Sequence, residues 1–301
     1  MFEALIEAGL VKRKRYENGL SVFKYARKVF YDKLWDTDEL LLEARGIVLD
    51  DDNNPVIWPF TKVFNHHENG TECEPDRIVC VARKVNGFMA AARWYNGELI
   101  VSTTGSLDSD FAVLARTHIE KLKTSEMMDW LTYIFEICDP SDPHIVEEQE
   151  GAYLIGARRM ANGYPMAHEY QLDDLAEEIG AKRPEWSYMT FREAHHMAET
   201  CKHEGFMIRD PDDGTTIMKI KSPHYLTKKF LMRMGMKKVD VMFDNKEEFL
   251  KTIDEEFYNV VHYITRWFDA DKWKGYTDQE RREIIEQYFH EIVYDAKKGE
   301  Y

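Results

Sequence analysis

Two lysine-containing segments carry the chemistry that this sequence offers most clearly. Lys84 lies in the stretch Lys84-Val85-Asn86-Gly87, and far downstream Lys219 and Lys221 form a Lys-x-Lys pair. A lysine amine can act as a nucleophile that accepts a nucleotidyl group, while further lysines hold the phosphates in line. A lysine three residues before a glycine is a weak signal alone, because the chain holds two other such matches. The ordered series of residues around Lys84 makes it the candidate catalytic residue.

The surroundings of Lys84 suit a nucleophile. A lysine amine attacks only when deprotonated, and its ordinary pKa of about 10.4 leaves it mostly protonated. Neighbouring cations and the removal of water lower such a pKa. Lys84 follows the apolar run 78–82, which we expect to be a rigid strand, and Gly87 would let the backbone approach a nucleotide closely. The alternative interpretation is an exposed lysine before a hairpin turn.

Two acidic residues stand in contexts that suggest partners. Glu136 lies inside the apolar run 133–138, where an acid costs free energy unless it is hydrogen-bonded or paired. It could accept a hydrogen bond from a ribose hydroxyl or lie near the amine; an edge-strand Glu facing water is the alternative. Glu204 precedes Gly205 at the start of another apolar run. Magnesium typically uses one or two protein carboxylates with phosphate oxygens, so Glu204 is a candidate metal ligand, unless it is an ordinary loop residue.

Lys219 and Lys221 would share one face of a strand, because alternate strand residues point the same way. Two cations there suit an α-phosphate and a departing pyrophosphate, whereas the alternative is a solvated strand face. The segment 219–239 holds seven basic residues and no acidic ones. In so acidic a chain this segregation predicts a track for a nucleic-acid backbone. Its candidate RNA-binding members are Lys228, Lys229, Arg233, Lys237 and Lys238.

The elements that must position these residues form an α+β pattern. Short apolar runs separated by turns predict strands at 20–26, 46–49, 56–60, 78–85, 88–94, 99–103, 133–138, 153–157, 206–208 and 217–221. Helices are expected at 110–123, 172–180 and 190–200. After Pro223 the apolar residues recur at helical spacing, and Thr277 to Glu280 form a capping-box pattern. We therefore expect two domains, residues 1–238 and a small helical domain of residues 239–301.

Composition restricts the class of protein. The 301 residues are 44% hydrophobic, which is ample for a packed core. A net charge of −15 argues against a nonspecific nucleic-acid coat, although not against a local basic groove. Four dispersed cysteines without a C-x-x-C pair favour a reducing cytoplasm, whether of a cell or of a virus-infected host. No run approaches the roughly 20 apolar residues of a membrane span, so no membrane partner is expected. Nothing in the sequence indicates an oligomeric state.

Three short features carry no predicted chemistry. His66-His67 and His195-His196 are adjacent pairs without the i, i+4 spacing of a helical metal site, so they are expected on the polar surface. The basic run 12–15 is interpreted as solvated charge.

The motifs taken in order resemble those of the covalent nucleotidyltransferases, which comprise DNA ligases, RNA ligases and capping enzymes. The matching order is Arg45-Gly46, Lys84-x-x-Gly87, Phe135-Glu136, Glu204-Gly205 and Lys219-x-Lys221. Within this superfamily the chain is most similar to the RNA ligase 1 type of T-even bacteriophages. The features that carry this closer likeness are Ala44 to Val48, Pro59 to Asn65, Thr104-Gly105-Ser106, and Lys219 to Ser222 followed by Tyr225.

The resemblance implies a fold and a reaction. The fold would be a nucleotidyltransferase (ATP-grasp-like ligase adenylation) domain with mostly antiparallel sheets, followed by a small all-α C-terminal domain. Lys84 would attack the α-phosphate of ATP and become lysyl-AMP. The AMP would pass to an RNA 5′-phosphate, and an RNA 3′-hydroxyl would displace it. The implied ATP-binding residues are Arg45, Lys62, Phe64, Gly87, Glu136, Glu204, Lys219 and Lys221. Glu204 would serve a divalent ion, Mg²⁺ or alternatively Mn²⁺.

Two alternatives remain open at this point. DNA ligases and capping enzymes resemble each other in following the Lys-x-Lys strand with a small β-barrel, whereas this chain continues as helices. A relative that binds RNA ends without sealing them is the other, because the stretch 102–106 lacks lysines that the phage enzyme carries. Asn86 also stands where the family commonly has an acid.

Overall fold

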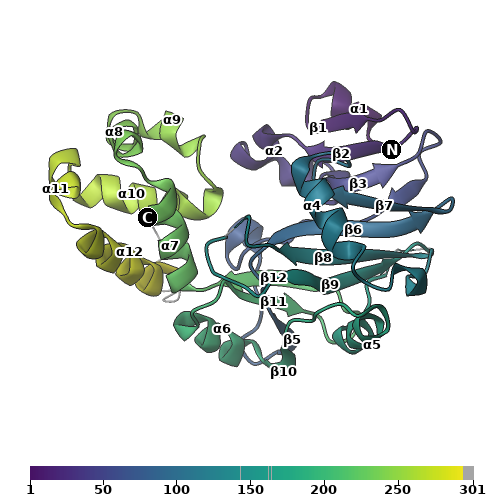
Figure 1. Cartoon of the computed structure of the whole chain (residues 1–301). Helices are drawn as coiled ribbons and strands as arrows, with labels where there is room; N and C mark the ends of the chain where they lie inside the picture. The colour runs from purple at the N-terminus through teal and green to yellow at the C-terminus, as the bar shows by residue number, and fades with distance from the viewer. Residues whose placement is uncertain (143, 162, 164, 294–301) are drawn as a thin grey trace.

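The computed structural model describes residues 1–142, 144–161, 163 and 165–293, and within them the strands form three separate four-stranded antiparallel sheets (Figure 1). We name them sheet A (order β1-β2-β3-β4), sheet B (β10-β5-β11-β12) and sheet C (β7-β6-β8-β9). The strands are β1 Val11–Arg15, β2 Ser21–Tyr25, β3 Arg45–Leu49, β4 Pro55–Ile57, β5 Ile78–Arg83, β6 Phe88–Tyr95, β7 Glu98–Thr103, β8 Leu131–Cys138, β9 Gly151–Arg159, β10 Trp186–Thr190, β11 Gly205–Arg209 and β12 Thr216–Lys221.

Helices connect the strands and make up the C-terminal part of the chain. The α-helices are α1 Glu3–Glu7, α2 Arg27–Tyr31, α3 Leu40–Glu43, α4 Asp110–Ile119, α5 Glu169–Ile179, α6 Phe191–Thr200, α7 Pro223–Arg233, α8 Met236–Asp244, α9 Lys246–Leu250, α10 Tyr258–Trp267, α11 Ala270–Gly275 and α12 Asp278–Val293. The 3₁₀ helices are η1 Leu34–Thr37, η2 Glu68–Gly70, η3 Thr124–Glu126 and η4 Glu255–Phe257.

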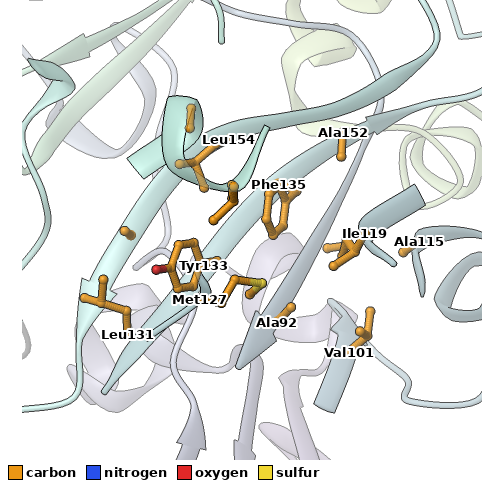
Figure 2. Packing of buried hydrophobic residues seen from close by; sticks show 14 of the residues in the cluster. Ala92, Val101, Ala115, Ile119, Met127, Leu131, Tyr133, Phe135, Ala152 and Leu154 are labelled. Atoms are coloured by element: carbon orange, nitrogen blue, oxygen red, sulfur yellow. The ribbon is translucent and has the colours of Figure 1, made fainter. Parts of the chain in front are cut away.

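Sheet C lies at the centre of the sheet region because both of its faces are apolar. Ala90 and Ala92 of β6 pack into the cluster beneath α4 and α5, whereas Ala91 packs against residues of sheet A. This alternation follows from the two-residue period of a strand. Tyr133 and Phe135 of β8 lie in the α4/α5 cluster with Leu154 of β9 (Figure 2). Glu136, one residue further along β8, therefore points to the opposite face.

Sheet B carries its own core under α6. Phe191, Ala194 and Ala198 of this helix pack on Val79, Val81 and neighbouring strand residues. The smaller cluster of Val85, Cys138 and Tyr153 joins sheet B to sheet C where the chain crosses from β5 to β6. The residues 84–87 thus lie at the junction of two sheets.

The helical part follows β12 directly through α7 and lies beside the sheets (Figure 1). Its apolar cluster starts at Tyr225 of α7 and includes Phe230, Phe257 and Phe289. The predicted domain boundary between residues 238 and 239 falls within α8. This boundary stays a prediction. Thr277 caps α12 as expected, since its Oγ1 accepts from the Glu280 amide at 3.2 Å. No helix among the described residues is long and apolar enough to span a membrane.

The α+β pattern with antiparallel sheets agrees with the sequence, but two strands were not expected. β1 contains the basic run 12–15, whose side chains are exposed while the backbone pairs with β2. β10 adds an edge to sheet B beside β5. Both are edge strands, and neither carries a run of buried apolar side chains, since four of the five in β1 are exposed and those of β10 are exposed or half-buried.

Candidate active site

Three strand ends of sheet B bring Lys84, Glu204 and Lys221 together. β11 pairs antiparallel with both β5 and β12, with Phe206 opposite Arg83 and Gly205 opposite Lys221. The end of β5, the start of β11 and the end of β12 therefore lie side by side, at the same end of the strands of sheet B. Backbone hydrogen bonds hold these strand ends, since the Lys84 amide donates to the Gly205 carbonyl at 2.9 Å and the Ser222 amide to the Glu204 carbonyl at 2.9 Å.

Two glycines permit the close approach of these strands. A Cβ on Gly87 would lie 2.2 Å from the carbonyl oxygen of Ile137 in β8. A Cβ on Gly205, whose φ is +135°, would lie 2.0 Å from the carbonyl oxygen of Ile220 in β12. Both distances are far shorter than a van der Waals contact, so any side chain would clash there. A side chain would also be strained at the φ of Gly205. The glycines that follow Lys84 and Glu204 thus fix the spacing of the site.

Lys84 and Glu204 form a largely buried ion pair. The Lys84 Nζ lies 3.0 Å from Glu204 Oε1, and the two side chains are 20% and 4% exposed. Asn86 Nδ2 donates to Glu204 Oε2 at 2.8 Å, and its Oδ1 accepts from the Val146 amide at 2.9 Å. Burial alone would raise the pKa of Glu204, but Lys84 and Lys221 hold it below its ordinary value. Asn86 therefore orients the carboxylate that holds the lysine.

Glu136 supplies a second carboxylate from sheet C. Its Oε1 accepts a hydrogen bond of 3.0 Å from the Gly87 amide, and the side chain is buried. Burial raises the pKa of Glu136 above its ordinary value, although the charge of Lys84 acts in the opposite direction. The sequence predicts that Glu136 needs a hydrogen-bonding partner, and within the protein that partner is the backbone amide of Gly87.

Lys219 and Lys221 both line the site from β12, as their alternation predicts. Burial lowers the pKa of Lys219 well below its usual value, and the charges of Lys221 and Lys62 lower it further. Among the described residues the Lys219 ammonium has no ion-pair partner. Lys221 is placed differently, because its Nζ lies 3.9 Å from Glu204 Oε1 and 2.5 Å from Glu256 Oε2.

Glu256 enters the site from η4 of the helical part. Its Oε1 lies 2.5 Å from the Nζ of Lys229, which also lies 3.0 Å from Asp254. Burial would raise the pKa of Glu256, but Lys221 and Lys229 depress it strongly. Charges of alternating sign thus run from the nucleophile candidate to the helices, in the order Lys84, Glu204, Lys221, Glu256, Lys229 and Asp254.

A cleft of about 520 Å³ is lined by most of these residues, although not by Glu256 or Asp254. Of the predicted ATP-binding residues, the cleft is lined by Arg45, Gly87, Glu136, Glu204, Lys219 and Lys221, together with Lys84. Lys62 and Phe64 do not line it. They lie behind Lys219, where the Phe64 carbonyl accepts from the Lys219 amide at 3.0 Å and Lys62 stands 4.8 Å from the Phe64 ring centre.

The predicted RNA-binding residues divide into two groups. Lys228, Lys237 and Lys238 are exposed, whereas Lys229 is buried in the site beside Glu256. The side chain of Arg233 lies outside the part of the chain that the structure describes.

The surface interpretation of His66 was wrong. Its side chain is only 11% exposed and its ring lies 5.1 Å from that of Phe191, because the loop after β4 turns back under α6. Burial lowers the pKa of His66 to about 4, so the ring is neutral at physiological pH.

Sequence reasoning missed Asn86 as an orienting residue and Glu256 altogether. Asn86 was visible in the lysine motif, and its amide could have been matched to a carboxylate of the same series. No sequence pattern indicated Glu256, because an acidic residue in an acidic helical region is expected to be surface charge. Only the fold places it beside the lysines.

Comparisons with known proteins relate the chain to ligases. A family model described as RNA ligase matches residues 43–238. A solved archaeal ATP-dependent RNA ligase is 15% identical, with a TM-score of 0.61 over 99% of this chain and 77% of its own. A putative ATP-dependent DNA ligase from Aquifex aeolicus is 13% identical, with a TM-score of 0.56 over 98% of this chain and 79% of its own. No curated protein matched the sequence at the level required of a relative. The structural likenesses confirm the predicted nucleotidyltransferase fold.

Proposed function

Because the chain belongs to the RNA ligase family, we propose that it is an ATP-dependent ligase that joins RNA ends through a lysyl-AMP on Lys84. The observation that carries this proposal is the meeting of Lys84 with two carboxylates, Glu136 and Glu204, and two further lysines, Lys219 and Lys221, around one cleft.

The first step uses the amine of Lys84 as the nucleophile. It attacks the α-phosphorus of ATP, a nitrogen–phosphorus bond forms, and pyrophosphate leaves with the electrons of the broken phosphoanhydride bond. The ammonium must first release its proton and leave the contact with Glu204. Lys219, Lys221 and Arg45 offset the charge that develops on the phosphates, and this is the electrostatic part of the catalysis. Glu136 is the candidate acceptor for a ribose hydroxyl.

The second and third steps move AMP and then release it. An oxygen of the RNA 5′-phosphate attacks the phosphorus of lysyl-AMP, the nitrogen–phosphorus bond breaks, and Lys84 takes up a proton. The product is an RNA end capped with AMP through a 5′–5′ pyrophosphate linkage. The 3′-hydroxyl of the other end then attacks the 5′-phosphate, AMP leaves, and a phosphodiester bond remains.

Glu204 fits a role as ligand for Mg²⁺, with Mn²⁺ as the alternative. Its lowered pKa keeps it ionised, and a carboxylate offers about four acceptor positions, more than Lys84 and Asn86 occupy. An ion there would supply positive charge to the phosphates of the nucleotide.

The substrate and location follow from the same reasoning. Lys228 of α7 and Lys237 and Lys238 of α8 are exposed cations on the helices that follow β12, and such cations suit the backbone of an RNA strand. All four cysteines are free thiols, as expected of an enzyme that works in a reducing cytoplasm.

The test is covalent labelling followed by sealing. Wild type incubated with α-labelled ATP and Mg²⁺ should retain the label through denaturing electrophoresis, and Lys84→Ala should not. A protein already carrying AMP would show the extra mass in the intact wild type. Labelled enzyme should then join a 5′-phosphorylated RNA to a 3′-hydroxyl RNA, with matched DNA ends and GTP as comparisons. Persistent labelling of Lys84→Ala, or no adenylate in any wild-type preparation, would refute the assignment.

A further inference from the structure

A second cavity lies on the other side of Lys219 and Lys221. Its volume of about 740 Å³ falls within the range of roughly 300–1,000 Å³ that is usual for ligand sites. It lies between the segment 30–35, the end of β12 and the helical part, including Tyr258 of α10. Lys219 and Lys221 line both this cavity and the nucleotide cleft. The two spaces therefore meet at the lysines that would hold phosphates.

The walls of this cavity combine aromatic rings with cations. Phe30 and Tyr31 of α2 face Tyr258 of α10, and the rings of Phe30 and Tyr258 lie 6.5 Å apart in an edge-on arrangement. The Tyr31 hydroxyl also donates to the Lys251 carbonyl, so α2 is linked to the helical part. Lys33, which follows α2, adds a positive charge to the lining of the same cavity. Aromatic rings beside lysines are the usual means of holding an unpaired base and its phosphate.

The charge balance of the cavity favours an anion. The carboxylate of Glu256 is engaged by Lys221 and Lys229, and Glu68 lies 3.5 Å from Lys62. Lys219 has no ion-pair partner within 4 Å among the described side chains, and the charge of Glu68 acts on it only from further away. A phosphate entering from this side would supply the missing negative charge. It would then lie close to Lys221, whose Nζ is 3.9 Å from the carboxylate that holds Lys84.

We propose that this second cavity binds the 5′-phosphorylated terminal nucleotide of the RNA, with its base against Tyr258 and Phe30 and its phosphate at Lys219. This inference rests on the proposed function and deepens it, because it assigns the place from which the RNA phosphate meets lysyl-AMP. The other ligand with phosphate chemistry is the β,γ-diphosphate of ATP. A bare diphosphate makes no use of the aromatic wall, which is why the RNA end is the occupant that the residues favour.

The test separates the first step from the second. Enzyme adenylated in advance is freed of ATP and mixed with a 5′-phosphorylated single-stranded RNA, and the formation of RNA-adenylate is followed in single turnovers. In Tyr258→Ala the RNA concentration for half-maximal rate should rise about 5- to 150-fold, the range expected for loss of one base stack. Tyr258→Phe keeps the ring and should behave as wild type. Lys33→Asn, at an exposed position with φ of +51°, should also raise that concentration and weaken its salt dependence.

The matched control is Trp267→Ala, at the other end of α10. This side chain is 56% exposed and does not line the cavity, so the RNA dependence should be unchanged. If Tyr258→Ala and Lys33→Asn instead raise the ATP concentration needed for lysyl-AMP formation, the cavity takes the diphosphate and the proposal fails. It also fails if neither step changes in Lys33→Asn, the variant at an exposed position. Absence of lysyl-AMP in the wild type would instead refute the proposed function.

Discussion

Lys84 is held as one half of an ion pair. Its ammonium lies 3.0 Å from Glu204, which Asn86 fixes from the other side. Such a pair keeps the amine in place, and the attack on ATP requires that the amine leave this contact. The carboxylate is the more deeply buried partner, and it depends on Lys84 for much of its compensation.

Replacing Lys84 should therefore affect stability as well as labelling. Lys84→Met leaves Glu204 buried with less compensation and should lower the free energy of unfolding by about 3 kcal/mol at pH 7.5. The folded-state pKa of Glu204 is lowered, so the pair stabilises the fold above the ordinary carboxyl pKa of about 4.3, and this contribution disappears as the pH falls through the folded-state value. Urea unfolding at pH 7.5 and pH 4 should show the smaller difference at pH 4.

Lys84→Arg is the matched control for that measurement. It keeps a cation beside Glu204 and should recover most of the stability, yet it should accept no label because a guanidinium stays protonated. If Lys84→Met were as stable as wild type at pH 7.5, Glu204 would not depend on this lysine.

At the level of elements, the site depends on the crossing from β5 of sheet B to β6 of sheet C. The residues 84–87 make this crossing, and Gly87 lies against the backbone of β8. One segment therefore positions the nucleophile and also joins the two sheets between which the cleft lies.

Gly87→Ala should disturb both functions of that segment. The new methyl group would lie 2.2 Å from the Ile137 carbonyl oxygen, so the segment 84–87 and β8 must separate, and we expect a loss of about 3 kcal/mol in stability together with loss of adenylation. Gly275→Ala is the control, because nothing lies within 4 Å of its would-be Cβ and its φ is not positive. Thermal unfolding of both variants tests the difference; equal melting temperatures would show that β8 can yield.

The sequence predicts where the strands of sheet B end better than it predicts the outermost strands of the sheets. Apolar runs ending at Lys84 and Lys221 indicate where these strands stop, and the motif order indicates that they meet. The charged strand β1 has no such run, because only its backbone is used in pairing. Glu256 was equally hidden, since its burial results from the packing of Phe257 and its neighbours rather than from the local sequence.

At the scale of the whole molecule, the helical part completes the electrostatics of the site. Glu256 neutralises Lys221 and Lys229, and its neighbour Phe257 is buried in the helical core. Through Glu256 the helices therefore supply the counter-charge of two lysines that line the cleft, and Glu256 itself lines the second cavity. A chain cut after residue 238 would lose this charge and expose the apolar face of α7.

Glu256→Gln tests this contribution in the full chain. It removes the carboxylate that Lys221 and Lys229 share and leaves them only Glu204 and Asp254 as carboxylate neighbours, so it should lower the free energy of unfolding by about 3 kcal/mol at pH 7. Because the folded-state pKa of Glu256 is depressed, the difference from wild type should shrink as the pH falls below about 4. Glu248→Gln removes one side of an exposed pair with Lys251 and should change stability by at most about 0.5 kcal/mol. If the two variants changed the free energy of unfolding equally, Glu256 would contribute no more than an exposed surface acid.

Because three strand ends meet at one end of sheet B, the sequence of such a chain can diverge widely without moving its reacting groups. Lys84, Glu204 and Lys221 are placed by backbone hydrogen bonds, not by the length of the segments between them. Loops and whole helices could be lengthened, shortened or replaced without moving the reacting groups. Proteins with 13% to 15% identity can then keep one architecture over nearly the full length of this chain. Distant members are better sought by the order of a few residues than by the distances between them in sequence.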